Sequence, residues 1–261
     1  MNRDQVWQEL KNDDTTVYGE PILNQFVRMT EHLKERHWDE LTPGQKRLAN
    51  PKVRLDFAPS IEEAERAIKD GAEDTWPTYR YAAKKGNMEL LKWLAKRDES
   101  PNWQGVMNGA AEGGDMEMLD WAKERSRGWP IDFLRPITMA ASSGNIHVLD
   151  ALEHHMPEDE EIRIEWLTQV LFNAAVNGQL EAVEWAAERG AQKRMWTLKN
   201  AAENGHTEVV KWLYDRLDSK PAELDVNDCI GRAKQAGRTE VADFLRNKLK
   251  ERFQNKLRGR K

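Results

Sequence analysis

Residues that could carry out chemistry are few in this sequence, and they are not grouped as a catalytic or metal centre would require. The densest cluster is Glu153-His154-His155, whose carboxylate and imidazole groups are typical transition-metal ligands. Adjacent residues on a helix point about 100° apart, so we interpret this cluster as structural or exposed side chains. No P-loop, G-x-G-x-x-G or H-E-x-x-H string occurs. The sequence therefore predicts no metal site, no cofactor and no catalytic residue.

The remaining candidates for chemistry are single residues without an evident partner in the sequence. Cys229 is the one cysteine, so it forms no disulfide within the chain, and no basic residue stands beside it to lower the pKa of the thiol. His206 occupies a recurring position of the repeat described below, and His147 replaces the usual glutamate of another recurring position. We therefore expect Cys229 to pack in the interior, and we expect the protein not to be an enzyme.

The composition argues against a membrane-spanning or disulfide-stabilised protein. The 261 residues include 40 Lys and Arg and 45 Asp and Glu, giving a formal net charge of −5. No stretch approaches the roughly 18 apolar residues that a transmembrane helix needs, and Met1 to Leu10 lacks the apolar run of a signal peptide. We expect a cytoplasmic monomer, although the basic C-terminal end would also suit a nuclear address.

The elements that must position any functional residues follow from an internal repeat. Six glycines recur at intervals of 27 to 34 residues, and in five of the six copies two alanines stand four and three positions before the glycine. The glycines are Gly86, Gly114, Gly144, Gly178, Gly205 and Gly237, preceded by Ala82-Ala83, Ala110-Ala111, Ala140-Ala141, Ala174-Ala175, Ala201-Ala202 and Ala233-Lys234. Seven positions after the glycine stand Trp93, Trp121, Ala151, Trp185, Trp212 and Phe244.

This pattern predicts a helix, a glycine turn and a second helix in each copy. Apolar residues at the fourth, fifth, seventh and eighth positions after the glycine, such as Leu90, Leu91, Trp93 and Leu94, form one face at helical periodicity. Glycine suits a left-handed helix end, and the paired alanines allow the first helix to approach its neighbour closely. We expect the four tryptophans that share one position to be buried in the core.

The repeat resembles the ankyrin repeat, T-P-L-H-x-A-A-x-x-G-H-x-E-x-V followed by an apolar run. Asn200 to Leu213, N-A-A-E-N-G-H-T-E-V-V-K-W-L, matches this pattern almost position for position, and Arg135 to Ala141, R-P-I-T-M-A-A, keeps part of its opening. The tryptophans make the chain similar to the divergent ankyrin arrays of protists and giant viruses. A tetratricopeptide array is the alternative, but it requires a fixed period of about 34 residues and does not explain A-A-x-x-G.

The resemblance implies an all-α, ankyrin-type helical-hairpin solenoid over residues 58–247, with about six repeats. Ser60-Ile61-Glu62-Glu63 is a capping box that opens an N-terminal half-repeat. Residues 1–57 are expected to form a helical cap or small module, with helices after Pro21 and around Thr42-Pro43-Gly44.

Three further segments complete the expected organisation. Residues 248–261 form a basic tail. The acidic run from Glu158 to Glu161 is interpreted as a solvated loop, and Cys229 is placed in the opening strand or turn of the sixth repeat. Trp166 and Trp196 are expected to precede first helices.

The resemblance implies a non-enzymatic protein-binding scaffold or adaptor. Ankyrin repeats bind proteins on a concave face that the first helices line, so the expected site is formed by the variable first-helix positions, here called the first-helix column. Its members are Tyr81, Lys84, Lys85, Glu112, Met139, Ser142, Ser143, Asn173, Asn177, Asn200, Glu203 and Asn204. Trp103, Trp129 and Trp196 lie in predicted connections and are candidates for surface anchors.

The alternative function is binding of nucleic acid or an anionic surface through the basic tail. Residues 246–261 contain eight Lys and Arg and one acidic residue, Glu251. The negative charge of the whole chain argues against nucleic acid as a partner of the array, because neutralising phosphates requires a basic face. As a solvated extension of the last helix, the tail would also complement the carboxyl end of that helix.

Overall fold

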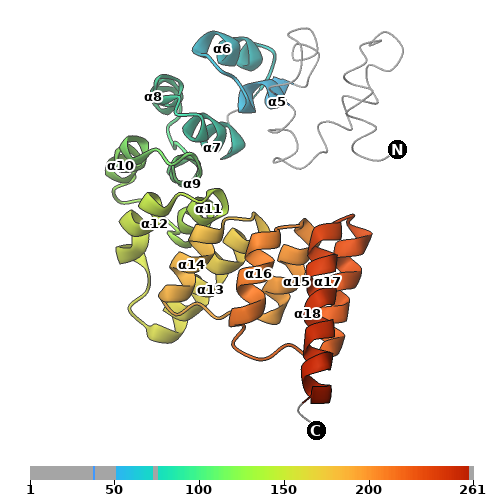
Figure 1. The fold of residues 1–261 in the computed structure, drawn as a ribbon. Coiled ribbons are helices and arrows are strands. Elements are labelled where there is room, and N and C mark those ends of the chain that lie inside the picture. The colour runs from blue at the N-terminus through green and yellow to red at the C-terminus, as the bar shows by residue number, and fades with distance from the viewer. Residues whose placement is uncertain (1–37, 39–50, 73–75, 259–261) are drawn as a thin grey trace, which may run out of the picture. The chain divides into compact units, whose positions relative to one another are not determined.

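The computed structural model describes residue 38 and residues 51–72 and 76–258, and its regular elements in these ranges are all helices (Figure 1). This confirms the predicted all-α class. No helix among these residues has the length and apolar character needed to cross a membrane. The helices predicted after Pro21 and around Thr42-Pro43-Gly44 lie outside the described residues.

The chain divides into two compact units, residues 1–110 with 117–131 and residues 111–116 with 132–261. The division falls inside residues 58–247, the range assigned to a single array from the sequence. In its described part the first unit contains α5 (Pro51–Asp56), α6 (Ile61–Lys69), α7 (Trp76–Lys84), α8 (Met88–Arg97), the start of α9 (Trp103–Gly113) and most of α10 (Met116–Arg125).

Two local features define the packing of the first unit. The Ser60 hydroxyl accepts a hydrogen bond from the Glu63 backbone N–H at 3.3 Å, so this part of the predicted capping box is confirmed at the start of α6. Helix α9 lies very close to α7, because a Cβ added to Gly109 would stand 2.0 Å from the carbonyl oxygen of Arg80. Glycine is required at position 109 by this contact between the two backbones.

The second unit is a succession of helix pairs, coloured from green to red in Figure 1. Its helices after α9 and α10 are α11 (Leu134–Ser143), α12 (Ile146–Leu152), α13 (Glu160–Val176), α14 (Leu180–Glu188), α15 (Met195–Asn204), α16 (Thr207–Arg216), α17 (Glu223–Gln235) and α18 (Thr239–Arg258), with a short 3-10 turn, η1 (Glu153–His155). The odd-numbered helices contact one another in chain order, and so do the even-numbered ones. Successive pairs therefore lie side by side.

The predicted helix, glycine turn and helix occur in all six copies. The six repeat glycines have φ between 71° and 86°, which is the left-handed region that glycine adopts without a Cβ penalty. The paired alanines are at most 1% exposed, whereas Lys234 of the sixth copy is exposed. Small side chains at these positions allow the first helices to pack closely, as expected from the sequence.

In the second unit, Asn145, His206 and Arg238, each directly after a repeat glycine, link their copy to the one before it. Asn145 donates from Nδ2 to the carbonyl oxygens of Ala111 and Glu112, both at 2.9 Å. Nε2 of His206 lies 2.8 Å from the carbonyl oxygen of Val176, one copy earlier. These polar side chains satisfy carbonyl groups that a helix end leaves without an intrahelical partner.

The structure corrects three details of the predicted organisation. The acidic run is not only a loop, because Asp159 caps α13 by accepting from the Ile162 N–H at 3.0 Å and the next two glutamates form the first helical turn. Carboxylates are favourable there because the amino end of a helix is positive. Trp166 lies inside α13 and Cys229 inside α17, rather than before a helix or in a strand. Residues 248–258 continue α18, in agreement with the interpretation of the tail as an extension of the last helix.

Candidate protein-binding surface

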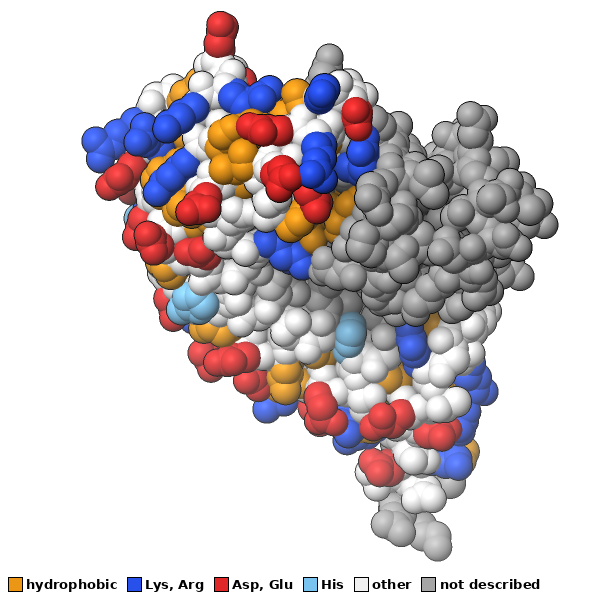
Figure 2. Space-filling view, turned by 90° about the horizontal axis from the view of Figure 1, so that it is seen from above, with side chains coloured by type: hydrophobic (Ala, Val, Ile, Leu, Met, Phe, Trp, Pro, Cys, Tyr) orange, Lys and Arg blue, Asp and Glu red, His pale blue; other side chains and the backbone are white. Residues whose placement is uncertain are grey.

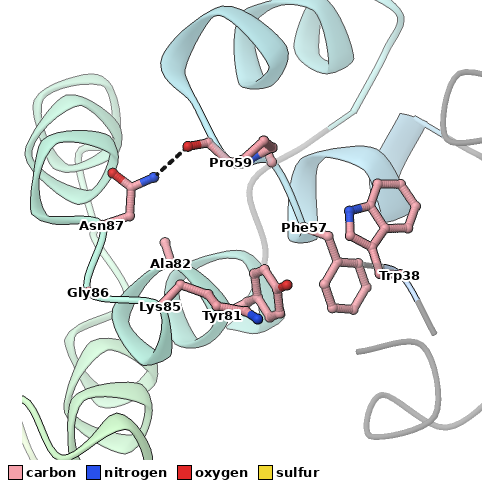
Figure 3. Close-up of a pocket in the computed structure, with 9 residues that line it drawn as sticks. Trp38, Phe57, Pro59, Tyr81, Ala82, Lys85, Gly86 and Asn87 are labelled. Atoms are coloured by element: carbon pink, nitrogen blue, oxygen red, sulfur yellow. Dashed lines mark hydrogen bonds between the residues drawn. The ribbon is translucent and has the colours of Figure 1, made fainter. Parts of the chain in front are cut away.

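Three members of the first-helix column belong to α7 and the turn after it, in the first unit. Figure 3 shows the Tyr81 ring beside Phe57; the two ring centroids lie 4.4 Å apart, edge to face, and Trp38 stacks on the other side of Phe57 at 5.3 Å. Tyr81 is 7% exposed and lines a cavity of about 440 Å³ together with these aromatic residues. It was predicted to be on the recognition surface, and this is corrected: Tyr81 is a packing residue because Phe57 covers it. Lys84 is half-buried and Lys85 exposed.

The remaining nine members lie in the second unit, in the carboxyl-terminal halves of α9, α11, α13 and α15 or directly after them. Asn177, Glu203 and Asn204 are exposed. Glu112, Met139, Ser142, Ser143, Asn173 and Asn200 are half-buried. Since the first helices of this unit contact one another in chain order, the structure brings the members on α11, α13 and α15 onto adjacent helices.

The asparagines of this surface are held by their own helices. In α13, Nδ2 of Asn173 donates to the Gln169 carbonyl oxygen and Nδ2 of Asn177 to that of Asn173, each at 2.8 Å. In α15, Asn200 and Asn204 make the same bonds to the residues four positions earlier, at 2.8 and 2.9 Å. With Nδ2 turned to the helix, the amide oxygen faces away from that carbonyl. These bonds restrict the rotamers before any partner binds.

An aromatic pair adjoins the asparagines. The rings of Phe172 on α13 and Trp196 on α15 lie 4.0 Å apart between centroids, and Trp196 is 41% exposed. Trp196 is one of the proposed surface anchors, although it lies within α15 rather than in a connection. Phe172 is not a member of the first-helix column. In the sequence, only its position next to Asn173 could have indicated that Phe172 belongs to this surface.

Charged residues of α15 and α17 form the far side of this surface. Lys199 contacts Asp225 and Asp228, each at 3.1 Å, and Arg232 contacts Glu203 at 3.1 Å and Asp228 at 3.4 Å. Hydrogen bonds to the two aspartates raise the pKa of Lys199, and the hydrogen bond from Lys199, with the charge of Arg232, lowers the pKa of Asp228. Lys199 and Asp228 are therefore both charged at neutral pH. Of the five, sequence reasoning selected Glu203 alone.

The tryptophan predictions are confirmed in part. Trp185 is 5% exposed, whereas Trp93, Trp121 and Trp212 are half-buried rather than fully in the core. Trp103 was a candidate surface anchor, but it is 7% exposed and packs edge to face on Trp121, with ring centroids 5.3 Å apart. Trp129 in the first unit is 46% exposed, as a surface anchor requires.

The side chains of Glu153 and His155 make structural contacts with neighbouring elements. Glu153 forms ion pairs with Arg163 at 2.9 Å and Arg189 at 3.0 Å, and the His155 ring stacks on Phe133 at 3.7 Å between centroids. Among the described residues, no group of three or more His, Cys, Asp or Glu side chains is arranged to hold a metal ion. Burial raises the pKa of the Cys229 thiol to about 12, so it is protonated at neutral pH and unsuited to nucleophilic attack.

Acidic and basic side chains alternate over the described part of the face in Figure 2, with small hydrophobic areas between them. An extended phosphate-binding face would instead be mainly basic. Comparison of the chain with protein-family models gives no match, and comparison with curated proteins gives none either.

Proposed function

We propose that this chain is a non-enzymatic scaffold of the ankyrin-repeat type, and that it binds a protein partner on the first helices of its second unit. The surface consists of Met139, Ser142 and Ser143 on α11, Phe172, Asn173 and Asn177 on or next to α13, and Trp196, Asn200, Glu203 and Asn204 on α15. No cofactor takes part in this function. The binding energy comes from contacts between side chains.

The ankyrin-type assignment is supported by the agreement between sequence motif and local structure. A-A-x-x-G coincides with a buried alanine pair and a left-handed glycine in copy after copy. The polar residue after the glycine reaches the preceding copy, as Asn145 and His206 do. A helical hairpin with these features buries its apolar face only against neighbouring hairpins, which is the physical basis of a repeat array.

The single observation that carries the proposed site is the exposed indole of Trp196 resting on Phe172. Aromatic side chains dominate interface energetics because they provide a large contact area and lose little conformational entropy on binding. The neighbouring Asn200 is already fixed by its bond to the Trp196 carbonyl oxygen. A partner therefore meets an anchor and a polar rim that need little reorganisation.

The proposal is tested by selecting peptide ligands from a displayed library against the full-length chain and measuring their dissociation constants by calorimetry. Replacing Trp196 by alanine should weaken a ligand of this surface about thirtyfold, which corresponds to the roughly 2 kcal/mol of an interface hot spot. Trp129→Ala is the matched control, because that indole is exposed to a similar extent, 46% against 41%, but lies in the first unit.

The outcome that would contradict the proposal is a set of selected ligands whose affinities fall with Trp129→Ala and are unchanged by Trp196→Ala and Asn200→Ala. Circular dichroism of each variant must show unchanged helicity, so that a loss of affinity reports on the surface rather than on folding.

A further inference from the structure

Four asparagines are arranged regularly on two neighbouring first helices of the second unit, and we call them the asparagine array. Asn173 and Asn177 stand five and one positions before the repeat glycine that follows α13. Asn200 and Asn204 stand at the same two positions on α15. Residues four apart lie on one face of a helix, and α13 contacts α15. All four side chains are exposed or half-buried, so a partner can reach them.

Each asparagine makes one hydrogen bond that determines which atoms of its amide remain for a ligand. Nδ2 donates to the backbone carbonyl oxygen four residues earlier, at 2.8 or 2.9 Å in every case. Because the carbonyl oxygen repels Oδ1, the donated hydrogen is the one that points away from Oδ1. Within the described part of the chain, no protein group donates to Oδ1 of these four residues. Each amide therefore presents an acceptor, Oδ1, beside a donor, the second hydrogen of Nδ2.

An acceptor beside a donor is complementary to the backbone of an extended peptide. In an extended chain the N–H and C=O groups of one residue point to the same side, and both can pair with one partner. Every second residue repeats this geometry after about 6.6 Å, and the two asparagines of one helix are about 6 Å apart along its axis. A helical ligand lacks such groups, because its backbone N–H and C=O groups bond to one another.

We infer that the partner binds as an extended peptide segment whose backbone pairs with the asparagine array. This inference rests on the proposed function and specifies the form of its ligand. Trp196 stands four residues before Asn200, on the same face of α15, and provides the contact for a ligand side chain. Backbone pairing does not depend on the ligand's sequence, so the array selects the conformation of the ligand and Trp196 selects one of its side chains.

Adenine is the alternative ligand for such an amide, since asparagine pairs with its N6 and N7 atoms. A nucleic-acid strand also carries a phosphate for every base, and these phosphates require cations beside the array. In the charged cluster of α15 and α17, the two cations are paired with three carboxylates, those of Glu203, Asp225 and Asp228. The charges next to the array therefore favour a peptide.

The experiment uses a linear peptide that is selected against the full-length chain and whose binding is weakened by Trp196→Ala. One backbone nitrogen of the peptide is methylated at a time, which removes a single N–H, and each dissociation constant is measured by calorimetry. At two positions separated by two residues, methylation should weaken binding to the unaltered chain about tenfold, because a hydrogen bond is lost.

Two double variants show whether the asparagines accept those hydrogen bonds. They are Asn173→Ala with Asn177→Ala, and Asn200→Ala with Asn204→Ala. In one of them the same methylations should weaken binding less than about twofold, because the pairing amides are already absent. Alanine is favourable in a helix, and circular dichroism must show unchanged helicity. Ser143→Ala is the matched control, because Ser143 occupies the equivalent position on α11 and has no amide; it should leave the methylation pattern unchanged.

The inference is overturned if methylation has the same effect on the unaltered chain and on both double variants. In that case the dependence on Trp196 remains, so the proposed scaffold function stands. If no selected ligand is weakened by Trp196→Ala, the proposed function and this inference both fail. Tighter binding of an oligoadenylate than of the peptide, lost in the double variants, would identify the array as a base-binding surface and overturn the peptide assignment.

Discussion

The guanidinium of Arg189 lies over the indole ring of Trp185, 4.1 Å from its centroid, while the indole Nε1–H donates to Asp150 Oδ1 at 2.7 Å. A guanidinium also lies over an indole ring in two other pairs, Arg97 over Trp93 at 4.6 Å and Arg216 over Trp212 at 4.8 Å from the ring centroid. The aromatic residue stands seven positions after the repeat glycine and the cation eleven, so each pair is one helical turn apart. Arg97 and Arg216 lie in the last turn of their helices, and Arg189 is the C-cap residue of α14; the helix dipole favours positive charge at this end.

Replacing Trp185 by alanine should lower the free energy of unfolding by about 3–5 kcal/mol, because the side chain is buried and its removal leaves a cavity. Urea denaturation measures this loss. Trp212→Ala should cost less, since Trp212 is half-buried in the equivalent position. Equal losses for the two variants would show that the ring's burial does not determine its contribution.

Glycine 178 combines a left-handed backbone with a close contact. Its φ is 75°, and an added Cβ would stand 2.4 Å from Nδ1 of His206. Gly178→Ala should therefore cost about 1–2 kcal/mol for the backbone, plus about 1 kcal/mol for displacing His206 from the Val176 carbonyl oxygen.

Gly190→Ala is the control for this substitution. Gly190 also has a positive φ, 102°, but no atom lies within 4 Å of the added Cβ. Gly190→Ala should therefore lower the free energy of unfolding only through backbone strain. Thermal denaturation of the two variants measures the difference. If Gly190→Ala is as destabilising as Gly178→Ala, the contact between neighbouring copies contributes nothing.

The buried thiol of Cys229 predicts a loss of stability at alkaline pH. Its pKa in the folded chain is about 12, against 9.0 for an ordinary cysteine, so the thiol ionises first in the unfolded chain as the pH rises. The free energy of unfolding should therefore decrease as the pH rises above 9. The Cys229 thiol contributes at most about 1.4 kcal/mol per pH unit to this decrease. Denaturation of the unaltered chain and of Cys229→Ala from pH 8 to 11 isolates the contribution; parallel curves would contradict it.

Lys199 controls the protonation of Asp228. Its hydrogen bond is the largest cause of the lowered pKa of that carboxyl group. Lys199→Met should therefore raise the pKa of Asp228, measured by a carbon-13 carboxyl titration, while Arg232 keeps part of the effect. A lowered pKa contributes stability above the ordinary aspartate range and loses it as the pH falls through the folded value. An unchanged titration of Asp228 would assign the shift to Arg232.

Local patterns in the sequence were sufficient for the helix, glycine turn and helix of each copy, although not for the start of α13 or for the position of Cys229 within α17. A glycine turn depends on the backbone of a few residues, and an amphipathic helix on a periodicity within about ten residues, so both could be predicted one copy at a time. The alanine pairs were predicted to be buried for the same reason. The arginines eleven positions after the glycine can also be read from the sequence. Their packing over the tryptophan rings was found only in the structure.

The tertiary structure decided which outward-facing positions form a surface. Tyr81, Met139 and Asn173 all stand five residues before a repeat glycine, yet Tyr81 is buried and the other two are half-buried. Phe57, from a segment outside the repeats, covers Tyr81. Likewise Phe172 reaches Trp196 on the next first helix. Sequence periodicity determines the direction of a side chain from its own helix, whereas its exposure depends on residues distant in the chain that fold against it.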